Sequence, residues 1–120
     1  MKQIQYENNT PIYLQIMQNI KQNIISGKWE PGSRISSVRD LSIVFGVNPN
    51  TMQRALTALE QEKLLYSERT SGRYITGDEQ IIKELRDNYA QSITQQFMAQ
   101  MQAIGYNKRQ MIQLLEEELP

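Results

Sequence analysis

The sequence predicts a mainly α-helical fold with one small β-hairpin, and three observations lead to this prediction. Apolar residues recur every three or four positions in several separate stretches, which is the period of amphipathic helices. The stretch LLYSERTSGRYIT instead has short β-prone ends around a polar centre, as a hairpin does. Helix-capping and turn-forming residues stand between these stretches. The expected order is therefore helix, short extended piece, helix, helix, hairpin and then more helix.

The first helix is expected to begin at Thr10-Pro11, with threonine as the N-cap and proline at the first helical position. It is expected to end at Gly27. Its inward face consists of Tyr13, Met17, Ile20 and Ile24, with Ile12 and Ile16 beside them. The segment KWEPGSRI then supplies a Pro-Gly turn and a short extended piece around Arg34-Ile35.

The second helix lies in SVRDLSIVFG, where Ser37 is predicted to be the N-cap and Gly46 to close the helix. Its inward residues are Val38, Leu41 and Phe45. The connection to the next helix, GVN, is as short as a helix-turn-helix requires.

The third helix is predicted over residues 48–62, with Asn48 as its N-cap and Pro49 where a missing N–H costs nothing. Its buried stripe repeats at i, i+3, i+4 and i+7: Met52, Ala55, Leu56 and Leu59. The outer face carries Asn50, Thr51, Gln53, Arg54 and Thr57. Together with the hairpin that follows, these helices predict an N-terminal winged helix-turn-helix.

An α-helical dimerisation segment is expected after the hairpin. One apolar stripe runs through residues 78–104, Gly105 ends that helix, and Asn107 caps a last helix with Met111, Leu114, Leu115 and Leu119 inside. Two helices cannot bury such a stripe well alone, so a second copy of the chain is the simplest cover. The predicted dimer residues are Leu85, Tyr89, Ile93, Phe97, Met101, Ile104, Met111 and Leu115.

The charge distribution agrees with two parts, a winged helix-turn-helix over residues 1–76 and a helical segment over residues 77–120. Residues 1–76 hold 9 Lys and Arg against 6 Asp and Glu, whereas residues 77–120 hold 4 against 7. Cysteine and histidine are absent, which excludes disulfides, the usual zinc sites and histidine-based catalysis. The sequence contains no apolar run long enough to span a membrane and no signal-peptide pattern at its start, so a cytoplasmic protein is expected.

The outer face of the third helix suggests DNA reading, because a helix in the major groove contacts bases with its first turns. Asn and Gln pair with adenine, Arg pairs with guanine, and Thr contacts a thymine methyl group or a phosphate. Asn50, Thr51, Gln53 and Arg54 are that set. Further candidates are Arg39, Arg34, Ser37, and Gly72-Arg73 at the expected hairpin tip, near the minor groove.

Each of these features also has a plainer explanation. The Asn48 segment can be only a cap before a solvated face, Arg39 can form an ion pair, Arg34 can be plain surface, and Gly72 can serve a tight turn. The short connection and the hairpin with a basic tip favour DNA binding. A winged-helix protein-interaction adaptor without DNA binding is the alternative. Its binding face should carry more apolar anchors.

Catalysis is not expected. The sequence shows no paired catalytic carboxylates, phosphate-binding loop or nucleophile–base arrangement, and no cofactor is implied. A small-molecule effector is conceivable, because Tyr89, Phe97 and the methionines could line a pocket between two chains. Such stripes usually form a dimer core instead.

Residues 10–76 resemble the GntR family of bacterial transcription regulators. PGSRISSVRDLS resembles the family's Pro-Gly, Leu-Pro-Ser, Arg-Glu-Leu-Ala pattern, and GVNPNTMQRALTALEQEKLL resembles its recognition helix. Ser36 stands where the family usually has proline, and the wing ERTSGRYI lacks the common Arg-Gly-x-Gly pattern. Residues 78–119, including AIGYNKRQMIQLLEEEL, are similar to the short two-helix C-terminal segment of the YtrA-like branch.

The resemblance implies a sequence-specific regulator, expected to be a repressor, that acts as a homodimer on a palindromic double-stranded DNA operator. It implies DNA contacts from Arg39, Asn48, Asn50, Thr51, Gln53 and Arg54, with Gly72 and its neighbours in the wing.

Overall fold

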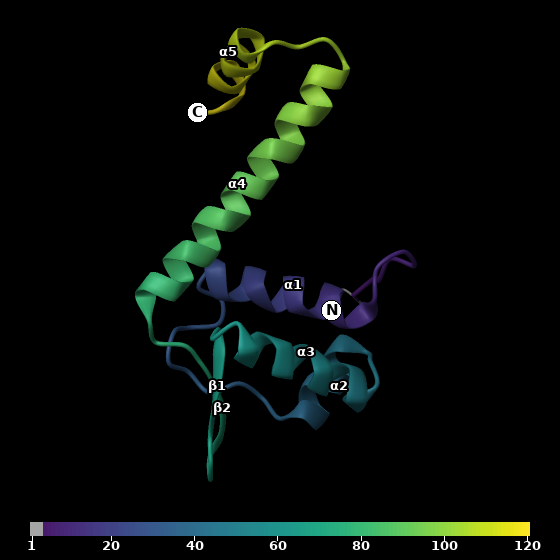
Figure 1. Ribbon diagram of the computed structural model, residues 1–120, viewed down its shortest axis with the longest axis vertical. Coiled ribbons are helices and arrows are strands. Elements are labelled where there is room, and N and C mark those ends of the chain that lie inside the picture. The colour runs from purple at the N-terminus through teal and green to yellow at the C-terminus, as the bar shows by residue number, and fades with distance from the viewer. Residues whose placement is uncertain (1–3) are drawn as a thin grey trace. The chain divides into compact units, whose positions relative to one another are not determined.

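The computed structural model describes residues 4–120, over which the chain forms five helices and one two-stranded antiparallel sheet (Figure 1). The elements are α1 (Ile12–Ile25), α2 (Val38–Phe45), α3 (Pro49–Gln61), β1 (Leu65–Glu68), β2 (Gly72–Ile75), α4 (Glu79–Ala103) and α5 (Lys108–Glu118). The predicted order of elements and the mainly α-helical fold class are confirmed. No helix within residues 4–120 combines the length and the apolar character that crossing a membrane requires.

The start of α1 differs from the prediction. The N-cap is Pro11 with an extended ψ of 139°, and no side chain caps the helix, so Thr10 is not the N-cap. The amide of Gln15 turns back instead, donates to the carbonyl oxygens of Thr10 and Glu7, and accepts the N–H of Glu7. This folded-back amide fixes the chain before the helix, a role that the sequence assigned to threonine. At the other end, Gly27 adopts a φ of 80° shortly after the last helical residue, as expected.

The helix-turn-helix forms as predicted. The Ser37 hydroxyl accepts the N–H of Asp40 at 3.1 Å, and Gly46 closes α2 in the left-handed conformation. The side chain of Asn48 accepts the N–H of Asn50 at 2.7 Å, with Pro49 at the first position of α3. Only three residues therefore separate the two helices.

The end of α3 is a left-handed cap on a residue that is not glycine. Lys63 has a φ of 65°, its N–H donates to the Glu60 carbonyl at 2.9 Å, and the N–H of Leu64 donates to the Leu59 carbonyl at 3.0 Å. This is the Schellman arrangement, in which glycine is the usual residue. Leu59 and Leu64 are both buried beneath the cap.

We expect Lys63→Gly to stabilise the winged helix-turn-helix. Glycine relieves a left-handed strain of about 1–2 kcal/mol. It also gives the unfolded chain more freedom, so the net gain should be about 0.5–1 kcal/mol. Urea unfolding of both proteins measures this difference. Gly46→Ala is the matched control, because it places a Cβ at a φ of 66° and should lower the free energy of unfolding. A less stable Lys63→Gly variant would contradict this account of the cap.

The hairpin is confirmed, but its tip lies earlier than predicted. Leu65 pairs with Ile75 and Glu68 pairs with Gly72, which leaves residues 69–71 as the turn. Gly72 and Arg73 are therefore strand residues at the base of the turn and not its tip. The extended piece predicted at Arg34 forms a bridge with Tyr74, and the N–H of Ile35 donates to the Arg73 carbonyl at 2.9 Å. This added pairing sets the register.

The core of the winged helix-turn-helix combines α1, α2, α3, the hairpin and the first turns of α4. Figure 1 shows α1 beside α3, with α2 near one end of α3 and the hairpin near the other. The buried apolar residues are Ile16, Met17, Ile20, Ile24, Leu41, Phe45, Met52, Ala55, Leu56, Leu59, Leu64, Leu65, Ile75 and Ile82. All four residues of the predicted α3 stripe are fully buried. Ile12, placed beside the inward face of α1, is instead 43% exposed.

The N-terminal segment is fastened to the end of α2. The hydroxyl of Tyr6 donates to the carbonyl oxygen of Phe45 at 2.6 Å, and burial raises the pKa of this phenol.

The chain divides into two compact units, residues 1–85 and 86–120. In the second unit, Asn107 and Gln110 form the predicted N-terminal cap of α5 and bond each other reciprocally. Met111 is buried, whereas Leu115 and Leu119 are 42% and 66% exposed, so the single chain leaves part of this apolar stripe uncovered. Ile93 and Ile104 of the predicted stripe are 50% and 70% exposed. Leu85 differs from both, because it packs against the core of the first unit.

Candidate nucleic-acid interface

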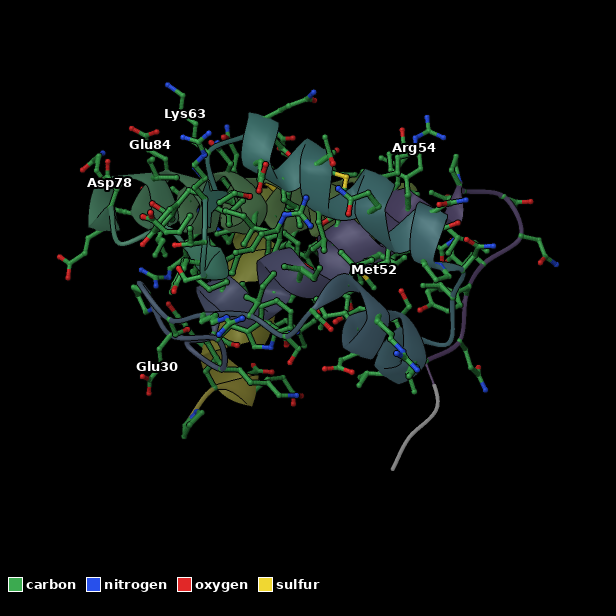
Figure 2. All side chains as sticks on the ribbon, turned by 90° about the horizontal axis from the view of Figure 1, so that it is seen from below. Glu30, Met52, Arg54, Lys63, Asp78 and Glu84 are labelled. Carbon is green, nitrogen blue, oxygen red and sulfur yellow. The ribbon has the colours of Figure 1, made fainter. Side chains whose placement is uncertain are left out.

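The outward face of α3 is polar along its length. Asn50, Gln53, Arg54 and Thr57 are exposed, and Thr51 is half-buried. Figure 2 shows Arg54 projecting outward from α3, whereas Met52 points toward the core. Asn48, predicted to contact DNA, uses its side-chain oxygen to cap the helix. The base-reading residue types therefore lie on the first turns of a short, firmly packed helix.

Arg54 is held by an aromatic ring from α1. Its guanidinium carbon lies 3.9 Å from the centroid of the Tyr13 ring, a cation–π contact. The sequence placed Tyr13 in the core, and the structure shows it half-buried with Arg54 over its face. The stack limits the motion of the arginine while its remaining N–H groups stay available.

A second network joins α3 to the wing, by which we mean the hairpin of residues 65–75. Arg73 donates from Nε to Oε1 of Glu60 at 2.8 Å and from Nη1 to Oε1 of Gln53 at 3.4 Å. Ser67, the cross-strand partner of Arg73, also donates to Glu60. The Nε2 group of Gln53 donates to the Thr57 hydroxyl at 3.2 Å. Arg73 and Gln53 were both predicted to contact DNA, and here they contact each other.

The carboxylate of Glu60 is stabilised in its charged form. Burial alone raises the pKa of Glu60, but hydrogen bonds from Ser67 and Arg73 and the positive charge of Arg73 outweigh it, so the pKa is lowered. A lowered folded-state pKa stabilises the fold above the unfolded-state value of about 4.3. That stabilisation is lost as the pH falls through the folded-state pKa.

We therefore expect the stability difference between the wild type and Glu60→Gln to shrink in acid. At pH 7 the wild type should be the more stable protein, because only the carboxylate forms an ion pair with Arg73. As the pH falls below the unfolded-state value toward the lowered folded-state pKa, the carboxyl becomes protonated and the difference in stability should shrink. Urea unfolding at pH 7, 5 and 3.5 measures the difference. An unchanged difference across this range would contradict the assignment.

A cleft of about 190 Å³ is lined by Arg34, Ser37, Gly72 and Arg73, which were predicted to contact DNA, together with Ile35, Ser36 and Val38. Gly72 has a φ of 119°, and a Cβ on it would lie 3.0 Å from Nε of Arg34. Glycine is therefore needed both for the backbone conformation and for the close approach of Arg34. Arg39 stands exposed as the second residue of α2.

Arg69 is a further candidate, which the sequence alone does not predict. It is exposed in the turn between the two strands, the position that had been assigned to Gly72-Arg73. Its signal in the sequence is weak, because SERTSGR offers several polar positions for the turn and only the strand register selects among them.

A short helix-turn-helix, a polar outward face on its second helix and a hairpin packed against that helix together define a winged helix-turn-helix DNA-binding protein. Residues 12–75 match the family model described as bacterial regulatory proteins, gntR family. The chain belongs to the GntR family, as its sequence resemblance predicted. It is a transcriptional regulator of the DNA-binding type and not an enzyme.

Two Bacillus subtilis proteins are similar in sequence. The uncharacterized HTH-type transcriptional regulator YhcF is 32% identical over 109 residues, which cover 91% of this chain and 90% of YhcF. The HTH-type transcriptional repressor YtrA is 40% identical over 76 residues, covering 63% of this chain and 58% of YtrA. These relatives agree with the predicted YtrA-like branch.

Solved structures share the fold. A GntR family transcriptional regulator from Listeria monocytogenes has a TM-score of 0.86 and 35% identity, with 93% of this chain and 98% of that chain covered. The DNA-binding domain of AraR, determined in complex with operator ORX1, has a TM-score of 0.54 and 29% identity over 63% of this chain and 92% of that chain.

Proposed function

We propose that the protein is a repressor that binds a palindromic operator as a homodimer. The outward face of α3 supports this proposal best, because Asn50, Gln53 and Arg54 are exposed on a capped helix that follows a three-residue connection. YtrA is named a repressor and the AraR domain was crystallised on an operator, which is consistent with the proposal. A regulator that acts on chromosomal DNA would work in the cytoplasm.

In this proposal α3 lies in the major groove and reads base edges with Asn50, Gln53 and Arg54, while Thr51 contacts a thymine methyl group or a phosphate. Arg39 lies at the start of α2 and Arg34 beside Gly72, where they bind the DNA backbone or a base edge. Asn48 and Ser37 contact the DNA through backbone groups at the starts of their helices, because their side chains already cap those helices. Arg69 is added as a phosphate contact at the tip of the wing.

The second unit would supply the dimer. Its exposed apolar residues Ile93, Ile104 and Leu115 continue the stripe that also contains Tyr89, Phe97, Met101 and Met111. A second copy would bury this stripe and hold two α3 helices about 10 base pairs apart, or a multiple of that distance. Residues 1–76 and 77–120 remain our proposed division between DNA binding and dimerisation.

The test is selection of bound duplexes from a random library, followed by footprinting of the selected site. Dimeric binding should enrich a two-fold symmetric sequence with two protected half-sites. Enrichment of an asymmetric site would contradict the proposed homodimer. Failure to enrich any sequence at low salt would contradict sequence-specific DNA binding.

A protein-interaction adaptor is the second candidate, because Ile43 and Val44 of α2 are 71% and 63% exposed. An adaptor should show no preference among duplexes. Replacing Ile43 and Val44 by serine should leave duplex selection unchanged if DNA is the partner.

A further inference from the structure

The side chain of Arg73 points back to α3 and forms hydrogen bonds with residues of that helix. Its side chain is 17% exposed, and Nε is bonded to a Glu60 carboxylate whose side chain is 28% exposed. The adjacent Ser67 occupies the same carboxylate from the neighbouring strand. Because the Glu60 carboxylate neutralises it, the Arg73 guanidinium attracts a DNA phosphate only weakly.

The other end of the guanidinium meets the amide of Gln53. Arginine has donors only, so the atom of Gln53 that faces it must be the oxygen. The contact of 3.4 Å is long for a hydrogen bond, and its main effect is electrostatic attraction of the amide oxygen and repulsion of the amide N–H groups. The Thr57 hydroxyl, which accepts from Nε2, holds the opposite end of the amide. Both ends of Gln53 therefore have assigned neighbours.

An assigned amide orientation matters for reading a base. Glutamine recognises adenine through one N–H donor and one oxygen acceptor at once, so reversal of the amide exchanges donor and acceptor and destroys the match. After the contacts to Arg73 and Thr57, Gln53 retains one further oxygen lone pair and one further N–H. These two groups have a fixed order along α3.

We propose that Arg73 is a positioning residue for DNA recognition. Held by the Glu60 carboxylate, it orients the Gln53 amide, so base preference at one operator position depends on this arginine of the wing. This inference rests on the proposed function, in which Gln53 reads a base edge. It replaces the earlier expectation that Arg73 itself contacts DNA, and it assigns a function to the Glu60 carboxylate, which would otherwise only oppose binding to a polyanion.

The two roles for Arg73 predict different effects of Glu60→Ala on base preference. If Arg73 bound a phosphate, removal of its counter-ion would free the guanidinium, strengthen binding to every duplex and leave base preference unchanged. If Arg73 positions Gln53, the same substitution releases the guanidinium from α3 and weakens base preference. Alanine favours helix, so α3 should still form.

The experiment uses the full chain with Arg73→Met, Glu60→Ala, Gln53→Ala and the double variant Arg73→Met/Gln53→Ala. Library selection gives base preference at each operator position, and affinity across a salt series gives the number of phosphate contacts. Arg73→Met and Glu60→Ala should both lower preference at the one position that Gln53→Ala affects, by about fivefold or more. The double variant should show no further loss of preference, because Arg73 acts through Gln53. Thermal unfolding identifies any variant that does not fold.

Arg69→Met is the matched control, since Arg69 is exposed at the tip of the wing. It should reduce the slope of log affinity against log salt by about 0.9 per half-site and leave base preference unchanged. Arg73→Met should leave the slope unchanged. A reduced slope with intact preference in Arg73→Met, or intact preference at that position in Glu60→Ala, would overturn the positioning role. If the wild type itself selects no sequence, the proposed function fails instead.

Discussion

Replacing Ile93 by glutamate is expected to convert the protein to monomers and to lower operator affinity by about 100-fold or more. Ile93 lies in α4, is 50% exposed in the single chain, and is a central member of the apolar stripe. In the proposed dimer it would be covered by the partner chain, and a buried, unpaired carboxylate is strongly unfavourable there. A dimer also binds its second half-site at an effective concentration near millimolar, an advantage that a monomer loses.

Gln95→Glu provides the matched control for this prediction. Gln95 is exposed two residues further along α4, away from the stripe, and the substitution introduces the same charge. Light scattering should report a dimer for this control and a monomer for Ile93→Glu, while a shift assay compares operator binding. Because Ile93 belongs to the second unit, the winged helix-turn-helix should unfold as in the wild type. Unchanged mass and affinity in Ile93→Glu would exclude this stripe as the dimer contact.

Local chemistry explains why most of the fold was predictable. Ser37, Asn48 and Asn107 each cap the helix that follows them, and Gly46 closes α2, because these roles need only the residue and its neighbours in sequence. The prediction that Thr10 is the N-cap of α1 was wrong because of a contact from further along the chain. The amide of Gln15 reaches back over eight positions to Glu7 and arranges the chain before Pro11.

The hairpin register could not be deduced from sequence, because a polar turn permits several registers that differ by one residue. The structure stacks Tyr66 on Tyr74 with ring centroids 5.5 Å apart and pairs Tyr74 with Arg34. The second contact spans forty residues of sequence, so no local pattern reports it. The register in turn decides that Arg73 faces α3 and that Arg69 occupies the turn.

In the candidate site, too, some residues were predictable from the sequence and others were not. Composition and spacing identified Asn50, Gln53 and Arg54 as base-reading residues on an outward face, and the structure exposes all three. Their neighbours were not predictable, because Tyr13 and Arg73 arrive from elements that meet α3 only in the folded chain. Sequence therefore indicated the reading groups, and the structure added the side chains that hold them.

Replacing both Arg39 and Arg54 by alanine is expected to remove most specific operator binding. Both side chains are exposed, one near the start of α2 and the other on the outward face of α3. A charged contact to a base or phosphate contributes about 1–3 kcal/mol, and a dimer loses each contact twice. The single variants should therefore weaken binding by about 30-fold or more. Fluorescence anisotropy with the selected operator at fixed salt measures these changes.

The salt series then separates the two arginines by the kind of contact each makes. Loss of an arginine that binds phosphate lowers affinity for all duplexes alike and reduces the salt slope, whereas loss of one that pairs with guanine relaxes base preference at one position. We expect Arg54→Ala to act mainly on preference, because Tyr13 already holds its guanidinium beside the reading face. Tyr13→Leu should reproduce part of this loss, and Tyr13→Phe should not, since phenylalanine keeps the ring. Arg109→Ala in α5 is the control for lost charge. Wild-type affinity in both Arg39→Ala and Arg54→Ala would refute the contact assignment.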